Sequence, residues 1–231
     1  MGLLFTMPQS GGKERTLQLN FGVETVEASL PAEWHAQSLV QLTWPHADTD
    51  WAPMLDEVDV CYVELATAIA TRQPLLIVTP EPERVRKLLY NKVDESRIRY
   101  FECPTNDTWA RDHAFLTMLT PQGPMLLDFC FNGWGMKFAA NHDNQINRRL
   151  FAAGLLRGAY RNCLDFVLEG GSIESDGRGT LLTTSTCLLA PNRNETKNRQ
   201  DIEDYLKSLF HLTQVLWLDH ATWQETTQTA I

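Results

Sequence analysis

A unit of two strands, a helix and a third strand occurs twice in this sequence. The first copy has predicted strands over 114–119 and 125–129, then a helix over 144–151 and a strand over 165–168. The second has a hairpin over 172–184 that turns at Asp-Gly-Arg-Gly, a strong turn signal. A helix over 201–209, with Asn198 as its candidate cap, and a strand over 214–218 follow. Such a repeat predicts an α/β propeller of ββαβ modules.

The N-terminal half adds one further module. A strand is predicted over 38–43, and a helix over 54–71 because its apolar residues recur at helical spacing. A buried strand follows Pro74, then a helix over 83–90 and a strand over 98–101. The chain therefore contains about three modules, although a ring of modules must close to cover its flanks.

Charge and hydropathy exclude several classes of partner. The net charge is −9, which argues against nucleic acid and anionic membranes. No apolar run reaches the length of a membrane span. The N-terminus, M-G-L-L-F-T-M, lacks the basic residues that precede the apolar part of a signal peptide. We expect a cytoplasmic protein with no membrane partner.

The cysteines predict free thiols. There are five, Cys61, Cys103, Cys130, Cys163 and Cys187, widely spaced and without a C-x-x-C pair. An odd number at such spacing favours a reducing compartment over a disulfide framework. The pattern does not match a zinc site, and the six histidines are scattered, so no metal is expected.

The stretch 104–112, P-T-N-D-T-W-A-R-D, concentrates chemistry-bearing side chains. Asp107 and Asp112 flank Trp109 and Arg111. One interpretation is a turn in which Asp107 bonds to its own backbone and Arg111 forms a surface pair with Asp112. The other is a pocket for a planar cation, because a carboxylate accepts two N–H bonds from one guanidinium edge and an indole offers it a face. The residues of this stretch leave both open.

Further motifs stand before and after this stretch. They are L-P-A-E-W at 30–34, L-T-W-P-H at 42–46, F-N-G-W-G-M-K-F at 131–138, E-G-G-S-I-E-S-D-G-R-G-T at 169–180 and N-R-N at 192–194. In this order and spacing the chain resembles the agmatine deiminase family, which includes the bacterial-type peptidyl-arginine deiminases. The resemblance covers Leu30 to about Leu218. It implies the pentein fold, with five ββαβ modules around a pseudo-fivefold axis and a guanidinium pocket at the centre.

The resemblance also implies an activity and its residues. The family's reaction is hydrolysis of agmatine to N-carbamoylputrescine and ammonia, a step of putrescine biosynthesis, without a cofactor. Asp112 resembles the guanidinium-binding aspartate, and Glu169 the acid that supports the catalytic histidine or the substrate. Both are predicted as catalytic, whereas Trp109, Asp107 and Trp134 are predicted to bind substrate. The plainer alternatives are an ion pair with Arg111 for Asp112, a solvent-facing acid for Glu169, and ordinary core positions for the tryptophans.

Two parts of the family pattern are missing. The catalytic histidine of the family lies in a G-D-D-T-D-x-H tract after W-L-x-x-G, and its nucleophilic cysteine lies in the last module. This chain instead reads W-L-D-H-A-T-W-Q-E-T-T-Q-T-A-I, and none of its five cysteines occupies the nucleophile's position; Cys187 matches a non-catalytic position. The resemblance therefore implies an inactive fragment with about three of five modules.

A shift of reading frame in the coding sequence would explain the divergent ending. Codons exist for the last eleven residues which, with one G added in front, read G-Y-L-A-G-D-D-T-D-S-H and restore the missing tract. We therefore expect an N-terminal tail over 1–20, a truncated pentein domain over 21–220 and a frameshifted tail over 221–231.

Three other functions remain open. One is a peptidyl-arginine deiminase, and another is a non-catalytic pseudoenzyme that binds a guanidine. The third, an amidinotransferase on the same fold, would need the same missing cysteine. The expected partner is a small cationic guanidine such as agmatine, and formation of a homo-oligomer is left open.

Overall fold

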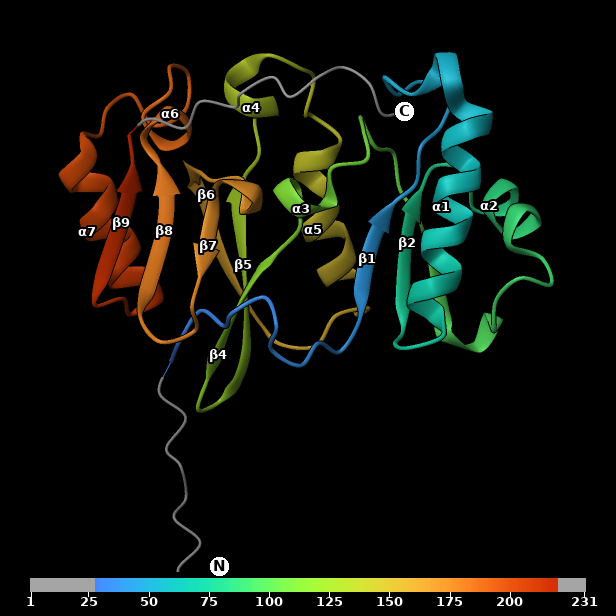
Figure 1. Cartoon of the computed structure of the whole chain (residues 1–231), viewed down its shortest axis with the longest axis horizontal. Helices are drawn as coiled ribbons and strands as arrows, with labels where there is room; N and C mark the ends of the chain where they lie inside the picture. Colours follow the sequence, from blue (N-terminus) through green and yellow to red (C-terminus); the bar gives the residue numbers. More distant parts are fainter. Residues whose placement is uncertain (1–27, 220–231) are drawn as a thin grey trace, which may run out of the picture.

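The computed structural model describes residues 28–219. The expected tails at 1–20 and 221–231 lie outside the described residues. Three three-stranded sheets stand side by side, with helices packed beside and between them (Figure 1). Within this part of the chain, no helix is long and apolar enough to cross a membrane.

The first sheet is parallel, in the order β1-β2-β3. Its strands are β1 (Val40–Thr43), β2 (Leu75–Thr79) and β3 (Ile98–Glu102). The chain returns between them through η1 (Ala52–Met54) and α1 (Leu55–Ala70), then α2 (Pro82–Leu89) and η2 (Glu95–Arg97). All five residues of β2 are buried, as a central parallel strand covered on both faces requires. Because a helix joins β1 to β2, this sheet lacks the hairpin of the other two.

The other two sheets share one topology. The second has β4 (Leu116–Thr120), β5 (Gly123–Cys130), α5 (Asp143–Ala152) and β6 (Ala159–Val167). The third has β7 (Ile173–Ser175), β8 (Thr180–Thr184), α7 (Arg199–Phe210) and β9 (Gln214–Leu218). In each, the first two strands are antiparallel and the last is parallel to the middle one. The predicted ββαβ repeat is therefore present.

Two apolar layers join the sheets. Leu76 and Val78 of β2 pack with Ile146 and Leu150, so α5 lies between the first and second sheets. A larger core joins the second sheet to the third, where the Phe129 ring lies 6.3 Å from Phe166 and 6.1 Å from Phe210. These two layers fix the positions of the three sheets, and therefore of the loops at their strand ends, relative to one another.

The prediction for β6 was too short. The strand begins at Ala159, six residues before the predicted start at 165. The sequence did not show its first half because β6 is an edge strand whose residues there, such as Arg161 and Asn162, are polar and exposed. Asn198 was predicted to cap the last helix, and its side chain accepts N–H bonds from Gln200 and Asp201. That prediction is confirmed.

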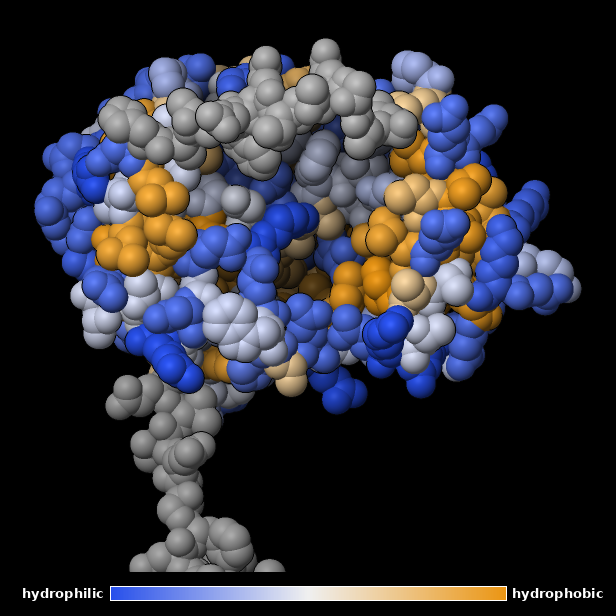
Figure 2. All heavy atoms as spheres, viewed as in Figure 1, coloured by the Kyte–Doolittle hydropathy of each residue, from blue (hydrophilic) through white to orange (hydrophobic). Residues whose placement is uncertain are grey.

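Four short helical turns that follow strand ends were not predicted from the sequence. They are α3 (Ala110–His113), α4 (Gly133–Met136), η3 (Gly170–Ser172) and α6 (Ser185–Leu188). Each follows the carboxyl end of a strand, and three of them contain or adjoin predicted site residues. Figure 2, drawn from the same side as Figure 1, shows a hollow in the middle of the viewed face, between the third sheet on the left and the first on the right.

Candidate functional site

The loop before α3 is held by one buried carboxylate. Asp143, at the start of α5, accepts N–H bonds from Asn106 at 2.7 Å and from Asp107 at 3.2 Å. The Asn106 side chain in turn accepts N–H bonds from His142 and Asp143. Burial raises the pKa of Asp143 to about 6. The loop that carries Asp107, Trp109 and Asp112 is therefore tied to α5.

Asp112 accepts one hydrogen bond on each carboxylate oxygen. The Gly171 backbone N–H donates to Oδ1 at 2.9 Å, and the Trp134 indole N–H donates to Oδ2 at 3.2 Å. Its neighbour Arg111 pairs with Glu33 and, at 3.6 Å, with Glu174. Asp112 is thus held by donors from two distant loops, and Arg111 is engaged elsewhere.

Glycine permits this close approach. A Cβ at Gly170 would lie 2.3 Å from the carbonyl oxygen of Arg111, and one at Gly171 would lie 2.4 Å from Oδ1 of Asp112. Atoms this close would have to shift apart. The pair Gly170-Gly171 therefore lets η3 pack directly against α3, which brings Glu169 and Asp112 to the same region.

Trp134 lies on a strained turn. Its φ is 58° and that of Met136 is 64°, a left-handed region that bulky residues rarely occupy. The Asn132 side chain accepts an N–H bond from Gly135 and stabilises this turn. The Trp134 ring packs edge-on against Phe131 at 5.2 Å and Phe138 at 5.6 Å. Strain of this kind concentrates at functional sites.

Trp109 continues an aromatic row. Its ring lies 5.8 Å from that of Trp134 and 6.3 Å from that of Trp51, a residue that the sequence had not indicated. Its indole N–H donates to Oδ2 of Asp107 at 2.9 Å, and Oδ1 of Asp107 accepts the Thr108 N–H. Asp107 therefore orients Trp109, which is 43% exposed. Asp107 therefore bonds to the backbone of its own loop, as the turn interpretation predicts.

Glu169 is a buried, paired acid. It is 2% exposed, and the Nε–H of Arg193 approaches its two carboxylate oxygens at 3.0 and 3.1 Å. The Arg193 side chain is 6% exposed. Glu169 therefore does not face solvent as a strand-end acid would. The sequence indicated N-R-N at 192–194 only as a motif and gave no role to Arg193, because the burial of Glu169, which requires a cationic partner, is a property of the fold.

A neutral histidine lies directly behind Asp112. Nε2 of His113 lies 3.2 Å from the Thr43 hydroxyl, and the His113 carbonyl accepts a hydrogen bond from Asn147. Burial lowers the pKa of His113 to about 4. This histidine is therefore uncharged near neutral pH and joins α3 to β1 and α5.

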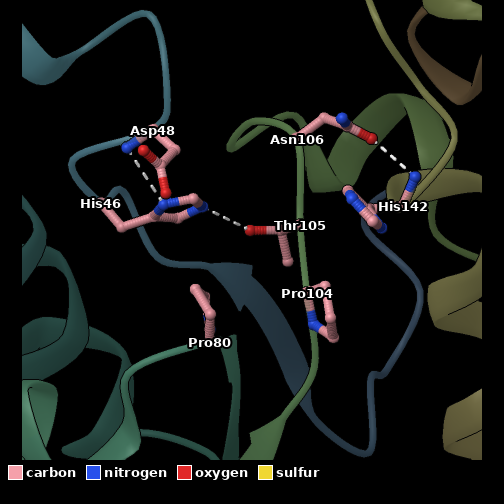
Figure 3. A pocket seen from close by; sticks show the side chains of 7 residues that line it. All are labelled: His46, Asp48, Pro80, Pro104, Thr105, Asn106 and His142. Atoms are coloured by element: carbon pink, nitrogen blue, oxygen red, sulfur yellow. Dashed lines mark hydrogen bonds between the residues drawn. The ribbon is translucent and has the colours of Figure 1, made fainter.

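A small pocket of about 320 Å³ opens on the other part of the same loop. It lies at the carboxyl ends of the parallel strands β1, β2 and β3, a common location for ligands. Its lining residues are His46, Asp48, Pro80, Pro104, Thr105, Asn106 and His142 (Figure 3). The Asp48 N–H donates to Nδ1 of His46, so Nε2 carries the proton and donates to Thr105. The pocket therefore has a fixed polar wall.

No cluster suited to a metal is found in the described part. Among residues 28–219, no three histidine, cysteine or acidic side chains lie together in a way that could hold an ion.

Comparison with known proteins places the chain among deiminases. Residues 29–231 match the model of the Porphyromonas-type peptidyl-arginine deiminase family. The agmatine deiminase of Stutzerimonas stutzeri (strain A1501) is 30% identical over 204 residues, 86% of this chain and 54% of that protein. The chain thus spans about half the length of the curated relatives it matches.

Solved structures of deiminases are also similar to this chain. A Porphyromonas gingivalis protein provisionally named an arginine deiminase is 51% identical, with a TM-score of 0.78 over 85% of this chain and 58% of that one. A C. jejuni agmatine deiminase variant with substrate bound is 34% identical, with a TM-score of 0.78 over 84% of this chain and 57% of that one.

Proposed function

Because the chain belongs to the Porphyromonas-type peptidyl-arginine deiminase family, we propose that its described part is the guanidinium-recognising portion of a deiminase. Such an enzyme hydrolyses a guanidinium group to a urea group and ammonia. The three sheets would be three of the five modules of a pentein ring, within the proposed domain over 21–220. The substrate would enter the hollowed face.

The observation that carries this proposal is the environment of Asp112. One N–H bond fixes each carboxylate oxygen, and each oxygen keeps a free lone pair. Two such lone pairs match the paired N–H groups along one guanidinium edge. The rings of Trp109, in the same loop as Asp112, and of Trp134, in the loop after β5, lie together and offer faces to a planar cation. Asp112 would bind the substrate, while Glu169, being buried, would support the site from behind.

Agmatine is the substrate we propose first. The relatives at 30% identity and above include several named for agmatine, and one relative's structure has substrate bound. A net charge of −9 suits a dication. Peptidyl arginine is the second candidate, since the matching family is named for it and Trp109 is exposed at the site's edge.

The complete reaction needs groups beyond those described. A thiolate attacks the guanidinium carbon, ammonia leaves with a proton from a histidine, and water then cleaves the amidino–cysteine bond to release the urea. Burial raises the pKa of the Cys103, Cys130 and Cys163 thiols, which disfavours a thiolate at any of them. We therefore propose that this chain alone binds a guanidine without turning it over.

Calorimetry with agmatine tests the binding function. We expect binding by the unsubstituted chain and a loss of about 10- to 100-fold in Asp112→Asn, since a hydrogen bond to a charged group contributes roughly 1.5–3 kcal/mol. Asp165→Asn, an exposed carboxylate on β6, is the matched control and should bind normally. Equal affinity in all three proteins would show that Asp112 does not hold the guanidinium. Free arginine, an arginine-containing peptide and an ammonia-release assay distinguish the alternatives.

A further inference from the structure

The N-R-N segment, Asn192–Asn194, contacts three separate parts of the candidate site. The side chain of Asn194 binds the backbone at the end of β6: the Val167 N–H donates to its Oδ1 at 3.0 Å, and its Nδ2 donates to the Val167 carbonyl at 2.9 Å. This pair of bonds imitates a neighbouring strand. It fixes the backbone two residues before Glu169.

Asn192 holds the strained turn that carries Trp134. Its carbonyl accepts a hydrogen bond from Nδ2 of Asn132 at 2.7 Å, and its own Nδ2 lies 3.4 Å from the Gly135 carbonyl. Asn132 in turn accepts the Gly135 N–H. The two asparagines therefore hold the 132–135 turn from both sides. Only Gly fits at 135, since a Cβ there would lie 2.9 Å from the Pro191 carbonyl.

Arg193 stands between these two contacts and neutralises Glu169. The pair is almost wholly buried, so neither charge is well solvated without the other. One N–H, that of Nε, serves both carboxylate oxygens and fixes the rotation of the carboxylate group. Arg193 thus determines the orientation of the Glu169 carboxylate.

We propose that Asn192–Asn194 is a positioning clamp for the guanidinium site. Arg193 pairs with Glu169 and orients its carboxylate, Asn194 fixes the strand end before it, and Asn192 holds the turn from which the Trp134 indole reaches Asp112. This inference rests on the proposed function, which makes Asp112 and Glu169 the groups that serve the guanidine. The three clamp residues act through their neighbours.

A double-substitution cycle tests the role of Arg193. Arg193→Met and Glu169→Gln are each expected to weaken agmatine binding about 10-fold or more. The double variant should bind no more than about 2-fold more weakly than either single variant, because both changes break one pair. Arg193→Lys should recover part of the affinity by restoring the charge. Fully additive losses would overturn the proposal, since they would mean independent roles.

A spectroscopic test does not depend on agmatine binding. The Trp134 indole N–H resonance, assigned by its loss in Trp134→Phe, reports on the bond to Asp112. Asn192→Ala removes the Nδ2 contact with the Gly135 carbonyl and keeps the backbone carbonyl that accepts from Asn132. Loss of this side-chain contact should move the resonance toward the position of a solvated indole and speed its hydrogen exchange. Asn91→Ala is the matched control, because Asn91 also has a left-handed φ, 58°, but lies beyond α2.

The two tests separate the two proposals. An unchanged Trp134 resonance in a folded Asn192→Ala protein, with the fold checked by circular dichroism, overturns the clamp. If the unsubstituted chain does not bind agmatine, the proposed function fails, while the Trp134 resonance still decides whether the clamp positions that side chain.

Discussion

The indole N–H of Trp134 donates to Oδ2 of Asp112 across 3.2 Å, and this bond joins the loop after β5 to the loop after β3. The Gly171 N–H brings the loop after β6 to the same carboxylate. Three strand ends therefore converge on one acid. The left-handed backbone at Trp134 lies at this point of convergence.

Replacing Trp134 by Phe should weaken agmatine binding modestly. The ring would still pack against Phe131 and Trp109, but Asp112 would lose one donor. A hydrogen bond to a charged group contributes roughly 1.5–3 kcal/mol, and because this bond acts on the substrate only through Asp112 we expect a smaller effect on binding, about a 2- to 10-fold higher Kd by calorimetry. Trp217→Phe is the matched control, because Trp217 also donates to a carboxylate, that of Glu203, but lies on β9. A change of the same size in the control would mean a general loss of stability.

Replacing Gly170 by Ala should destabilise the protein and disturb the site. The new methyl group would press on the Arg111 carbonyl and push η3 away from α3. Overpacking of this kind costs roughly 1–3 kcal/mol, and each kcal/mol lowers the Tm by about 2–4 °C in a domain of this size. Gly154→Asn should have little effect, because that position has open space around it and a left-handed φ that Asn tolerates. Calorimetric melting of the two variants compares them directly.

Two buried groups, His113 and Asp143, should change the free energy of unfolding in opposite directions as the pH falls. His113 has its pKa lowered from 6.5 to about 4 by burial, so between these values the unfolded chain binds a proton that the folded chain does not. The free energy of unfolding therefore falls as the pH falls through that window. Asp143 has its pKa raised from 3.8 to about 6, also by burial, so between these values the folded chain binds a proton that the unfolded chain does not. Its contribution to the free energy of unfolding therefore increases as the pH falls below about 6.

Single substitutions separate these two contributions. In Asp143→Asn the effect of His113 is unopposed, and stability should fall more steeply between about pH 6 and about pH 4 than in the unsubstituted chain. In His113→Gln the slope should be shallower or reversed. Urea unfolding followed across this range measures both slopes. Parallel curves for all three proteins would mean that neither group titrates with the shifted pKa.

The exposed leucines of the edge strand β9 predict self-association of the chain. Leu216 and Leu218 are 48% and 47% exposed on the edge strand of the third sheet. Edge strands with exposed apolar residues pair readily with other chains. We therefore expect a concentration-dependent homo-oligomer by size-exclusion chromatography with light scattering, shifted toward monomer in the double substitution Leu216→Thr and Leu218→Thr.

An equivalent substitution elsewhere controls for general solubility. Val60 on α1 is 61% exposed and equally apolar. If Val60→Thr disperses the oligomer and the β9 variant does not, the interface lies on α1 and the edge-strand prediction is wrong.

The sequence by itself determined the elements whose cause is local. The strand at 214–218 and the Asn198 cap were predictable because a short apolar run and a helix cap depend on neighbours within a few residues. The two ββαβ units were visible for the same reason. The choice of Asp112 and Glu169 came from motif resemblance, and their roles remain a prediction.

The tertiary structure alone decided which partners these residues have. Nothing near Glu169 in the chain indicates Arg193, which is 24 residues away, and nothing near Asp112 indicates Trp134. Such pairs form because packing of α5 and α7 brings distant strand ends together, and a buried charge or indole N–H then takes the partner that the fold supplies. The low pKa of His113 has the same origin, since burial is a property of the whole fold and of no single stretch of sequence.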